Sequence, residues 1–168
     1  RNIVHLQALC DKAKLANRPH IKTHKSPLLA LRQMEAGATG ITCQKLGEAE
    51  VMVGAGIKDI LIATNIIGAT RSGRLAALLR DVPLKVCADN PTSLNAYAEA
   101  GRAADRPVTV VIECDTGQKR AGVVTPNEAV ALAKTVQRDP WLEFGGLMFY
   151  PPLDGWAATQ EFFDTTRA

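Results

Sequence analysis

The chain has 168 residues and a formal net charge of +3 at pH 7; 46% of its residues are hydrophobic and 22% are charged. These proportions are typical of a globular domain and exclude an intrinsically disordered chain, a collagen-like chain and a disulfide-dense scaffold. The weak positive charge and the 5% aromatic content argue against a nucleic-acid-binding module. No apolar run reaches the roughly 18–20 residues of a membrane span. The four cysteines form no CxxC pair, so we expect reduced thiols in a cytoplasmic protein.

Short β-rich runs alternate with longer amphipathic stretches along the whole chain. In chain order the pattern predicts helix Asn2–Ala16, strand His20–His24, helix Pro27–Ala36, strand Gly40–Cys43, helix Leu46–Gly54, strand Asp59–Thr64, helix Ser72–Arg80, strand Leu84–Ala88, helix Thr92–Ala100, strand Val108–Cys114, helix Asn127–Arg138, strand Phe144–Phe149 and a helix from Gly155 to the end. Ser26 before Pro27 is a typical helix start, and Thr125 with Glu128 forms a capping-box pattern. Continuous apolar runs such as Val108–Ile112 indicate parallel strands covered by helices on both sides.

The alternation indicates βα units of a parallel α/β sheet or barrel. About six such units are present, whereas a closed (β/α)8 barrel has eight and takes about 250 residues. We therefore expect residues 1–168 to form one incomplete barrel domain. Such a partial barrel would expose sheet edges, and we expect it to be neither active nor stable alone.

Polar residues recur where the expected strands end, which is where ligands of parallel α/β folds bind. These residues are Lys22, Thr23, His24, Cys43, Gln44, Thr64, Asn65, Asp89, Asn90, Glu113, Asp115, Lys119, Arg120 and Tyr150. Because strands commonly exit into polar loops, their placement alone is compatible with either a binding site or ordinary loop structure.

The expected strand His20–His24 is more informative. Alternate residues of a strand share a face, so His20, Lys22 and His24 would point the same way. A lysine at the mouth of a barrel loses its proton more easily than one in water, which suits Schiff-base chemistry. A solvated edge strand remains the alternative. A metal site at the two histidines is the weaker interpretation, because no third ligand lies nearby in the sequence.

Three segments resemble the D-threonine aldolase and D-serine dehydratase family of pyridoxal phosphate (PLP) enzymes, which have the alanine-racemase-like, fold-type III architecture. They are RPHIKTHK at 18–25, GITCQKLGEA at 40–49 and DTGQKRAG at 115–122. The resemblance implies a partial TIM barrel of the alanine racemase N-terminal type that binds PLP. It also implies a C-terminal β-domain outside this chain.

The resemblance assigns roles to individual residues. Lys22 would be the catalytic Schiff-base lysine that holds the cofactor, with Lys25 a much weaker candidate. Arg120 matches the arginine that contacts the phenolic oxygen of PLP, where a fixed cation would stabilise negative charge.

Further pocket residues follow from the same resemblance. Gln44, Asn65 and Tyr150 would line the cofactor pocket, and His24 would lie behind it or on the substrate side. Segment 146–152 departs from the aldolase pattern, which leaves substrate specificity open.

The resemblance implies a lyase acting on small D-3-hydroxy amino acids, either by aldol cleavage or by dehydration, in a homodimer without nucleic-acid or membrane partners. A divalent metal, manganese or zinc, would assist, with ligands outside this chain. One alternative is a PLP-dependent amino-acid racemase of the alanine type. Another is a non-catalytic PLP-binding protein, although that group carries a lysine segment different from 18–25.

Overall fold

Five parallel strands form one sheet in the computed structural model, which describes residues 1–167, and they pair in chain order. The strands are β1 (Ile41–Cys43), β2 (Ile60–Ile62), β3 (Leu84–Ala88), β4 (Val108–Cys114) and β5 (Leu142–Phe149). The helices are α1 (Asn2–Lys12), α2 (Pro27–Glu35), α3 (Leu46–Gly54), α4 (Ala69–Asp81), α5 (Pro91–Ala104), α6 (Pro126–Arg138) and α7 (Trp156–Arg167). A doubly wound sheet would reverse its strand order at some point, whereas chain order throughout is the arrangement found in βα barrels.

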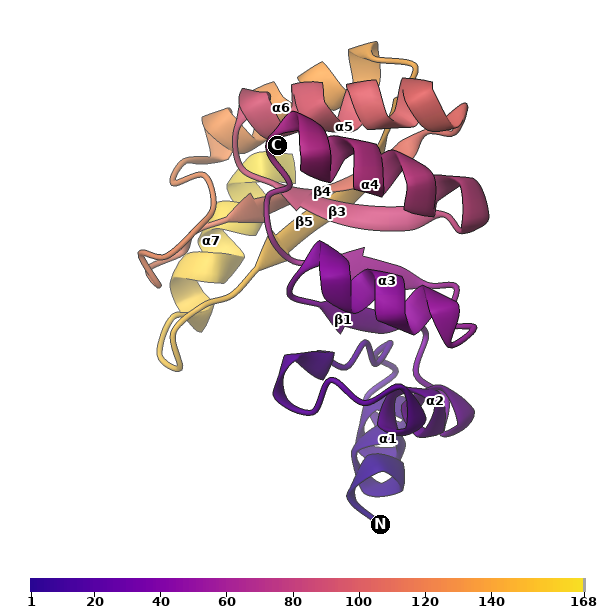
Figure 1. The fold of residues 1–168 in the computed structure, drawn as a ribbon. Helices are drawn as coiled ribbons and strands as arrows, with labels where there is room; N and C mark the ends of the chain where they lie inside the picture. The colour runs from indigo at the N-terminus through magenta and orange to yellow at the C-terminus, as the bar shows by residue number, and fades with distance from the viewer. Residues whose placement is uncertain (168) are drawn as a thin grey trace.

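Figure 1 shows α4 and α5 side by side over β3 and β4, and α3 over the β1 end of the sheet. The strand residues beneath the helices are fully buried, among them Val108, Val110 and Ile112 of β4. The residues that alternate with them along the strand, such as Glu113, point to the opposite side of the sheet. Register is regular except between β4 and β5, where Gly145 is left unpaired as a bulge.

Most expected elements are present close to their expected bounds. The strands Leu84–Ala88 and Val108–Cys114 and the helix Leu46–Gly54 have the bounds predicted from the sequence. Helix α1 stops at Lys12 rather than Ala16, because Lys14 has a positive φ of 56° that turns the chain. The expected final helix corresponds to α7, and Ala168 lies outside the described residues.

The predicted strand His20–His24 is wrong. Only His20 pairs, as an isolated bridge to Thr42, and Ile21–Thr23 form a 3₁₀ helix, η1. The two histidines explain the difference, because their Nδ1 atoms accept from the backbone N–H groups of Lys22 (3.3 Å) and Ser26 (3.0 Å). Such local bonds offer the backbone an alternative to a strand ladder. Five strands therefore stand where six were expected, and the predicted shared face of the two histidines and Lys22 does not form.

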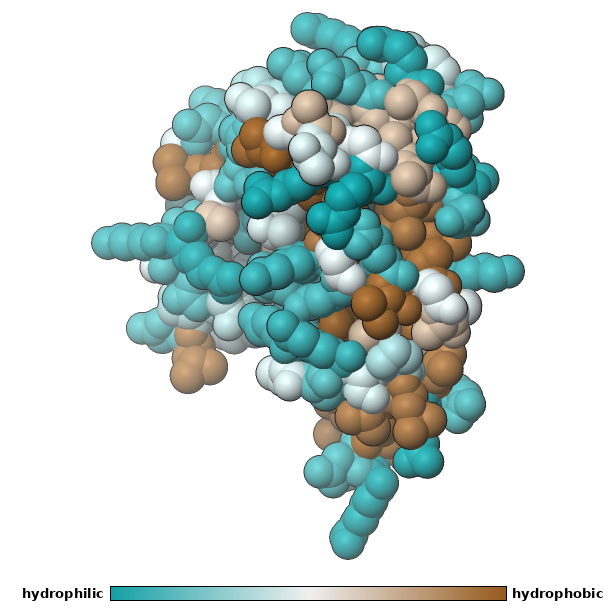
Figure 2. Space-filling model, in the orientation of Figure 1, coloured by the Kyte–Doolittle hydropathy of each residue, from teal (hydrophilic) through white to brown (hydrophobic). Residues whose placement is uncertain are grey.

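The first two helices carry apolar side chains on their surface. Val4, Leu6 and Leu9 of α1 and Leu28 of α2 are each more than half exposed. Figure 2 shows hydrophobic surface at the lower end of the molecule, where α1 and α2 lie. Within residues 1–167, no helix is both long and apolar enough to cross a membrane.

Candidate active site

A cavity of about 340 Å³ lies at the carboxyl ends of the strands and collects residues from distant parts of the chain. It is lined by Arg18, His20, Lys22, Thr42, Gln44, Leu61, Ala63, Glu113, Arg120, Met148, Phe149 and Tyr150. The structure thus brings together Lys22, Gln44, Arg120 and Tyr150, four of the six residues expected around a cofactor. Parallel α/β folds bind ligands at this end of the sheet.

Two cations flank one aromatic ring in this cavity. Lys22 Nζ lies 5.9 Å from the centre of the Tyr150 ring, and Arg120 Cζ lies 5.7 Å from it. Both distances are within the range of cation–π attraction, which stabilises such pairs by about 0.5–1 kcal/mol at exposed sites. Lys22 and Arg120 are exposed and Tyr150 is half-exposed, so the cavity opens to solvent with a positive rim suited to an anionic ligand.

A chain of hydrogen bonds fixes the backbone of Lys22. Its N–H donates to His20 Nδ1, and the Nε2 atom of the same ring lies 3.3 Å from Gln44 Oε1. Gln44 Nε2 in turn donates to the carbonyl of Ala63 at 3.2 Å, just beyond β2. Burial and the nearby charge of Lys22 lower the pKa of His20, which favours the neutral ring that this accepting and donating pattern needs. Lys22 is thereby tied to two strand ends.

Arg120 lies on a tight loop that leaves β4. Asp115 Oδ1 accepts from the backbone N–H groups of Gly117 (2.9 Å) and Lys119 (3.0 Å). This is the side-chain-to-backbone pattern that makes aspartate common in turns. Segment 115–122 therefore carries Arg120 and also contains the hydrogen bonds that hold its own turn in shape.

Glu113 also lines the cavity. The sequence places it at a strand end, but it was not among the residues expected in the site. Burial and the charge of Asp89 raise its pKa, while Arg120 partly offsets this rise. Within the part of the chain that the structure describes, no hydrogen bond or ion pair engages its carboxylate. The signal that could have found it is the alternation along β4, which sets Glu113 opposite the buried face that contains Ile112.

Two expected pocket residues lie outside this cavity. Asn65 hydrogen-bonds Asp89 and Ser93 instead, both at 2.8 Å. The Nδ1 atom of His24 accepts from Ser26, and its Nε2 atom is buried without a partner among residues 1–167.

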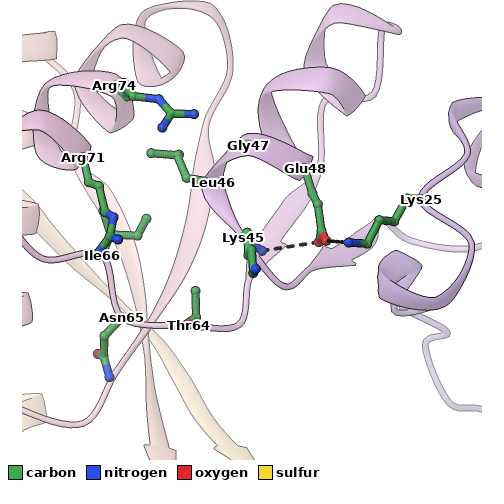
Figure 3. A pocket seen from close by; sticks show the side chains of 10 residues that line it. All are labelled: Lys25, Lys45, Leu46, Gly47, Glu48, Thr64, Asn65, Ile66, Arg71 and Arg74. Atoms are coloured by element: carbon green, nitrogen blue, oxygen red, sulfur yellow. Dashed lines mark hydrogen bonds and ion pairs between the residues drawn. The ribbon is translucent and has the colours of Figure 1, made fainter.

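Asn65 borders a second, larger cavity of about 520 Å³. Figure 3 shows Glu48 of this cavity between Lys45 and Lys25. Its carboxylate accepts from the backbone of Gln44 (2.7 Å) and Lys45 (3.3 Å) and pairs with Lys25 Nζ at 3.2 Å. Lys25, the weaker candidate for cofactor attachment, is thus held in an ion pair away from the cavity of Lys22.

The chain matches characterised proteins along most of its length. The family model described as "Alanine racemase, N-terminal domain" matches residues 1–166. D-threonine aldolase from Arthrobacter sp is 40% identical over 149 residues, which are 89% of this chain and 39% of that protein. D-threo-3-hydroxyaspartate dehydratase from Delftia sp. (strain HT23) is 35% identical over 88% of this chain and 39% of that protein.

A solved structure gives the same result. The crystal structure of D-threonine aldolase from Filomicrobium marinum superposes with a TM-score of 0.85 and 38% identity, over 88% of this chain and 40% of that one. The chain thus spans well under half the length of the relatives that it matches. By sequence and by fold, it belongs to the family of alanine racemase N-terminal domains.

Proposed function

We propose that this chain is the cofactor-binding part of a PLP-dependent lyase that acts on D-3-hydroxy amino acids. The observation that carries the proposal is the convergence of Lys22, Arg120 and Tyr150 in one cavity at the strand ends. The sequence identity of 40% to a D-threonine aldolase and of 35% to a D-threo-3-hydroxyaspartate dehydratase supports the substrate class.

The side chains of the cavity fit the chemistry of PLP. The cofactor presents an aldehyde, an acidic phenolic oxygen and a phosphate, and this cavity offers an amine and a permanent cation. When bound, PLP takes up the electron pair of the bond that breaks at the substrate α-carbon. Lys22 would hold the aldehyde carbon covalently, and the Arg120 guanidinium would hold the phenolic oxygen.

Each of these residues then has a defined task. In the PLP-loaded protein, Lys22 Nζ would also accept and return a proton at the substrate side of the cavity. The Arg120 guanidinium would stabilise negative charge that develops on the cofactor. The Tyr150 ring lies within cation–π distance of both cations.

A metal would have to be held elsewhere in the protein. Among the residues that the structure describes, no group of three or more His, Cys, Asp or Glu side chains could hold a metal ion. We therefore propose that the expected manganese or zinc has its ligands outside residues 1–167.

The cofactor site is tested by borohydride reduction of the complete PLP-loaded protein, followed by peptide mapping. We expect a pyridoxyl group on Lys22, its loss in Lys22→Ala and its retention in the control Lys25→Ala. A label on Lys25, or no label at PLP saturation, would overturn the assignment.

The reaction class is tested separately with D-threonine and D-3-hydroxyaspartate as substrates. We expect lyase activity that a chelator abolishes and manganese or zinc restores. Racemisation of alanine that is insensitive to the chelator, without lyase activity, would instead establish the racemase alternative.

A further inference from the structure

We propose that Asp89 is a positioning residue for Arg120. Its carboxylate accepts a hydrogen bond from Gly122, at the end of the loop that carries Arg120, and so holds this loop at the end of β3. The inference rests on the proposed function, in which Arg120 holds the phenolic oxygen of the cofactor. It also explains Asn65, which lies outside the cavity, as a residue that holds Asp89 in place.

The carboxylate of Asp89 accepts three hydrogen bonds. Its Oδ1 accepts from Asn65 Nδ2 at 2.8 Å and from Asn90 Nδ2 at 2.7 Å, and its Oδ2 accepts from the backbone N–H of Gly122 at 3.0 Å. Both oxygens therefore face donors, and a carboxylate can accept hydrogen bonds at both of its oxygens. An asparagine at 89 would turn an NH₂ group toward at least one of these donors in either orientation.

The partners of Asp89 are themselves fixed. Ser93 Oγ donates to Asn65 Oδ1 at 2.8 Å, which turns the Asn65 amide group toward Asp89. Asn90 Oδ1 accepts from Ser93 N at 2.9 Å and so caps α5. Asp89 is thereby locked between the end of β2 and the first turn of α5.

The loop that Asp89 fastens has little freedom at this end. Gly122 has φ 107°, and a Cβ there would lie 2.6 Å from the backbone nitrogen of Asp115. The next residue, Val123, exchanges backbone hydrogen bonds with Glu113 and Asp115 at 2.8–2.9 Å. Arg120 lies two residues before this anchor. The bond to Asp89 ties the loop to β3 as well as to its own strand, β4.

The structural half of the inference is tested in the complete protein without PLP, by hydrogen exchange of the segment that contains Gly122. Asp89→Asn should speed exchange there about tenfold or more, because the N–H loses its acceptor. Asn65→Ala, which removes a hydrogen-bond donor to Asp89, should also speed exchange in this segment. It replaces Asp89→Asn as the test variant if Asp89→Asn does not fold. Asp81→Asn, the same change at an exposed position at the end of α4, should have no effect. Unchanged exchange in both test variants overturns the inference whatever the activity shows.

The functional half is tested with the PLP-loaded protein. Asp89→Asn should lower kcat about tenfold to a hundredfold with a smaller change in KM, as a displaced catalytic group does. The variant Arg120→Ala distinguishes a failure of the role of Asp89 from a failure of the role of Arg120. If Arg120→Ala is inactive while Asp89→Asn is fully active, the positioning role is wrong. If Arg120→Ala is itself fully active, the role proposed for Arg120 fails, and the exchange result still decides whether Asp89 anchors the loop.

Discussion

Arg18 and Asp59 form an ion pair at the amino end of β2, with Arg18 Nη1 2.8 Å from Asp59 Oδ1. Lys85 Nζ lies 2.7 Å from the same oxygen. One carboxylate just before β2 therefore joins the segment that leads to Lys22 with β3. Because Arg18 also lines the cavity, this pair joins the sheet to the wall of the cavity that contains Lys22.

The ion pair predicts a defined loss of stability in acid. Burial alone would raise the pKa of Asp59, but the hydrogen bonds and charges of Arg18 and Lys85 outweigh it and lower the pKa. The unfolded chain then takes up a proton near pH 4 while the folded carboxyl is still ionised. The stabilisation is present above that pH and is lost as pH falls through the folded-state pKa.

The measurement is urea unfolding of the complete protein and of Asp59→Asn between pH 7 and pH 3. At pH 7 the variant should be less stable by about 1 kcal/mol, since the side chain is partly exposed. The difference should shrink toward pH 3. A difference that is the same at every pH would show that the charge of Asp59 does not contribute.

Gly40 makes room for this pair and supplies a second prediction. A Cβ at Gly40 would lie 2.7 Å from the carbonyl oxygen of Asp59 and closer still to Arg18 Nη1. Gly40→Ala should therefore displace Arg18 and lower the free energy of unfolding by about 1–3 kcal/mol. The control is Gly54→Ala in α3, where nothing lies within 4 Å and alanine should stabilise the helix by about 0.5–1 kcal/mol. Equal thermal shifts for the two variants would contradict the steric argument.

The fold was predictable where the sequence pattern is local and continuous. The apolar run of β4 and the helix Leu46–Gly54 have the bounds that the sequence pattern predicts. The segment 20–25 was not predictable from its alternation. Its turn depends on ring nitrogens that accept backbone bonds at Lys22 and Ser26, and the geometry of side-chain acceptors is invisible to a residue pattern.

The site was predictable only in part, for a related reason. Polar residues at strand ends point to the carboxyl end of the sheet, and Lys22 and Arg120 do line one cavity there. Position at a strand end does not say whether a side chain faces a ligand or a neighbouring residue. Asn65 bonds Asp89 rather than lining that cavity, whereas Glu113 lines it.

Tyr97 links β3 to the loop that follows β2 through its hydroxyl, and this supplies a third prediction. The buried O–H donates to the carbonyl of Cys87 at 2.7 Å and accepts from the N–H of Ile66 at 3.0 Å. Tyr97→Phe leaves both backbone groups unpaired in the core and should lower the free energy of unfolding by about 1–3 kcal/mol. Thermal unfolding measures the loss. Tyr150→Phe removes a hydroxyl from a half-exposed ring and should leave the midpoint nearly unchanged, so equal shifts would count against the buried bonds.

The four thiols should differ sharply in reactivity. Burial raises the pKa of Cys43 and of Cys114 to about 12, and it raises the pKa of Cys87 further. Because the thiolate is the reactive form, these three should resist alkylation in the folded protein. Cys10 on α1 is only half-buried and should react first.

Brief treatment of the native protein with iodoacetamide, followed by peptide mapping, tests this order. We expect label on Cys10 within minutes, and on Cys43, Cys87 and Cys114 only after unfolding in urea. Cys10→Ser should remove the early label from residues 1–167 and leave the thermal midpoint nearly unchanged, since α1 packs loosely. Early label on Cys87 would mean that the sheet opens between β3 and its neighbours on the same time scale, and that the core is less closed than its burial indicates.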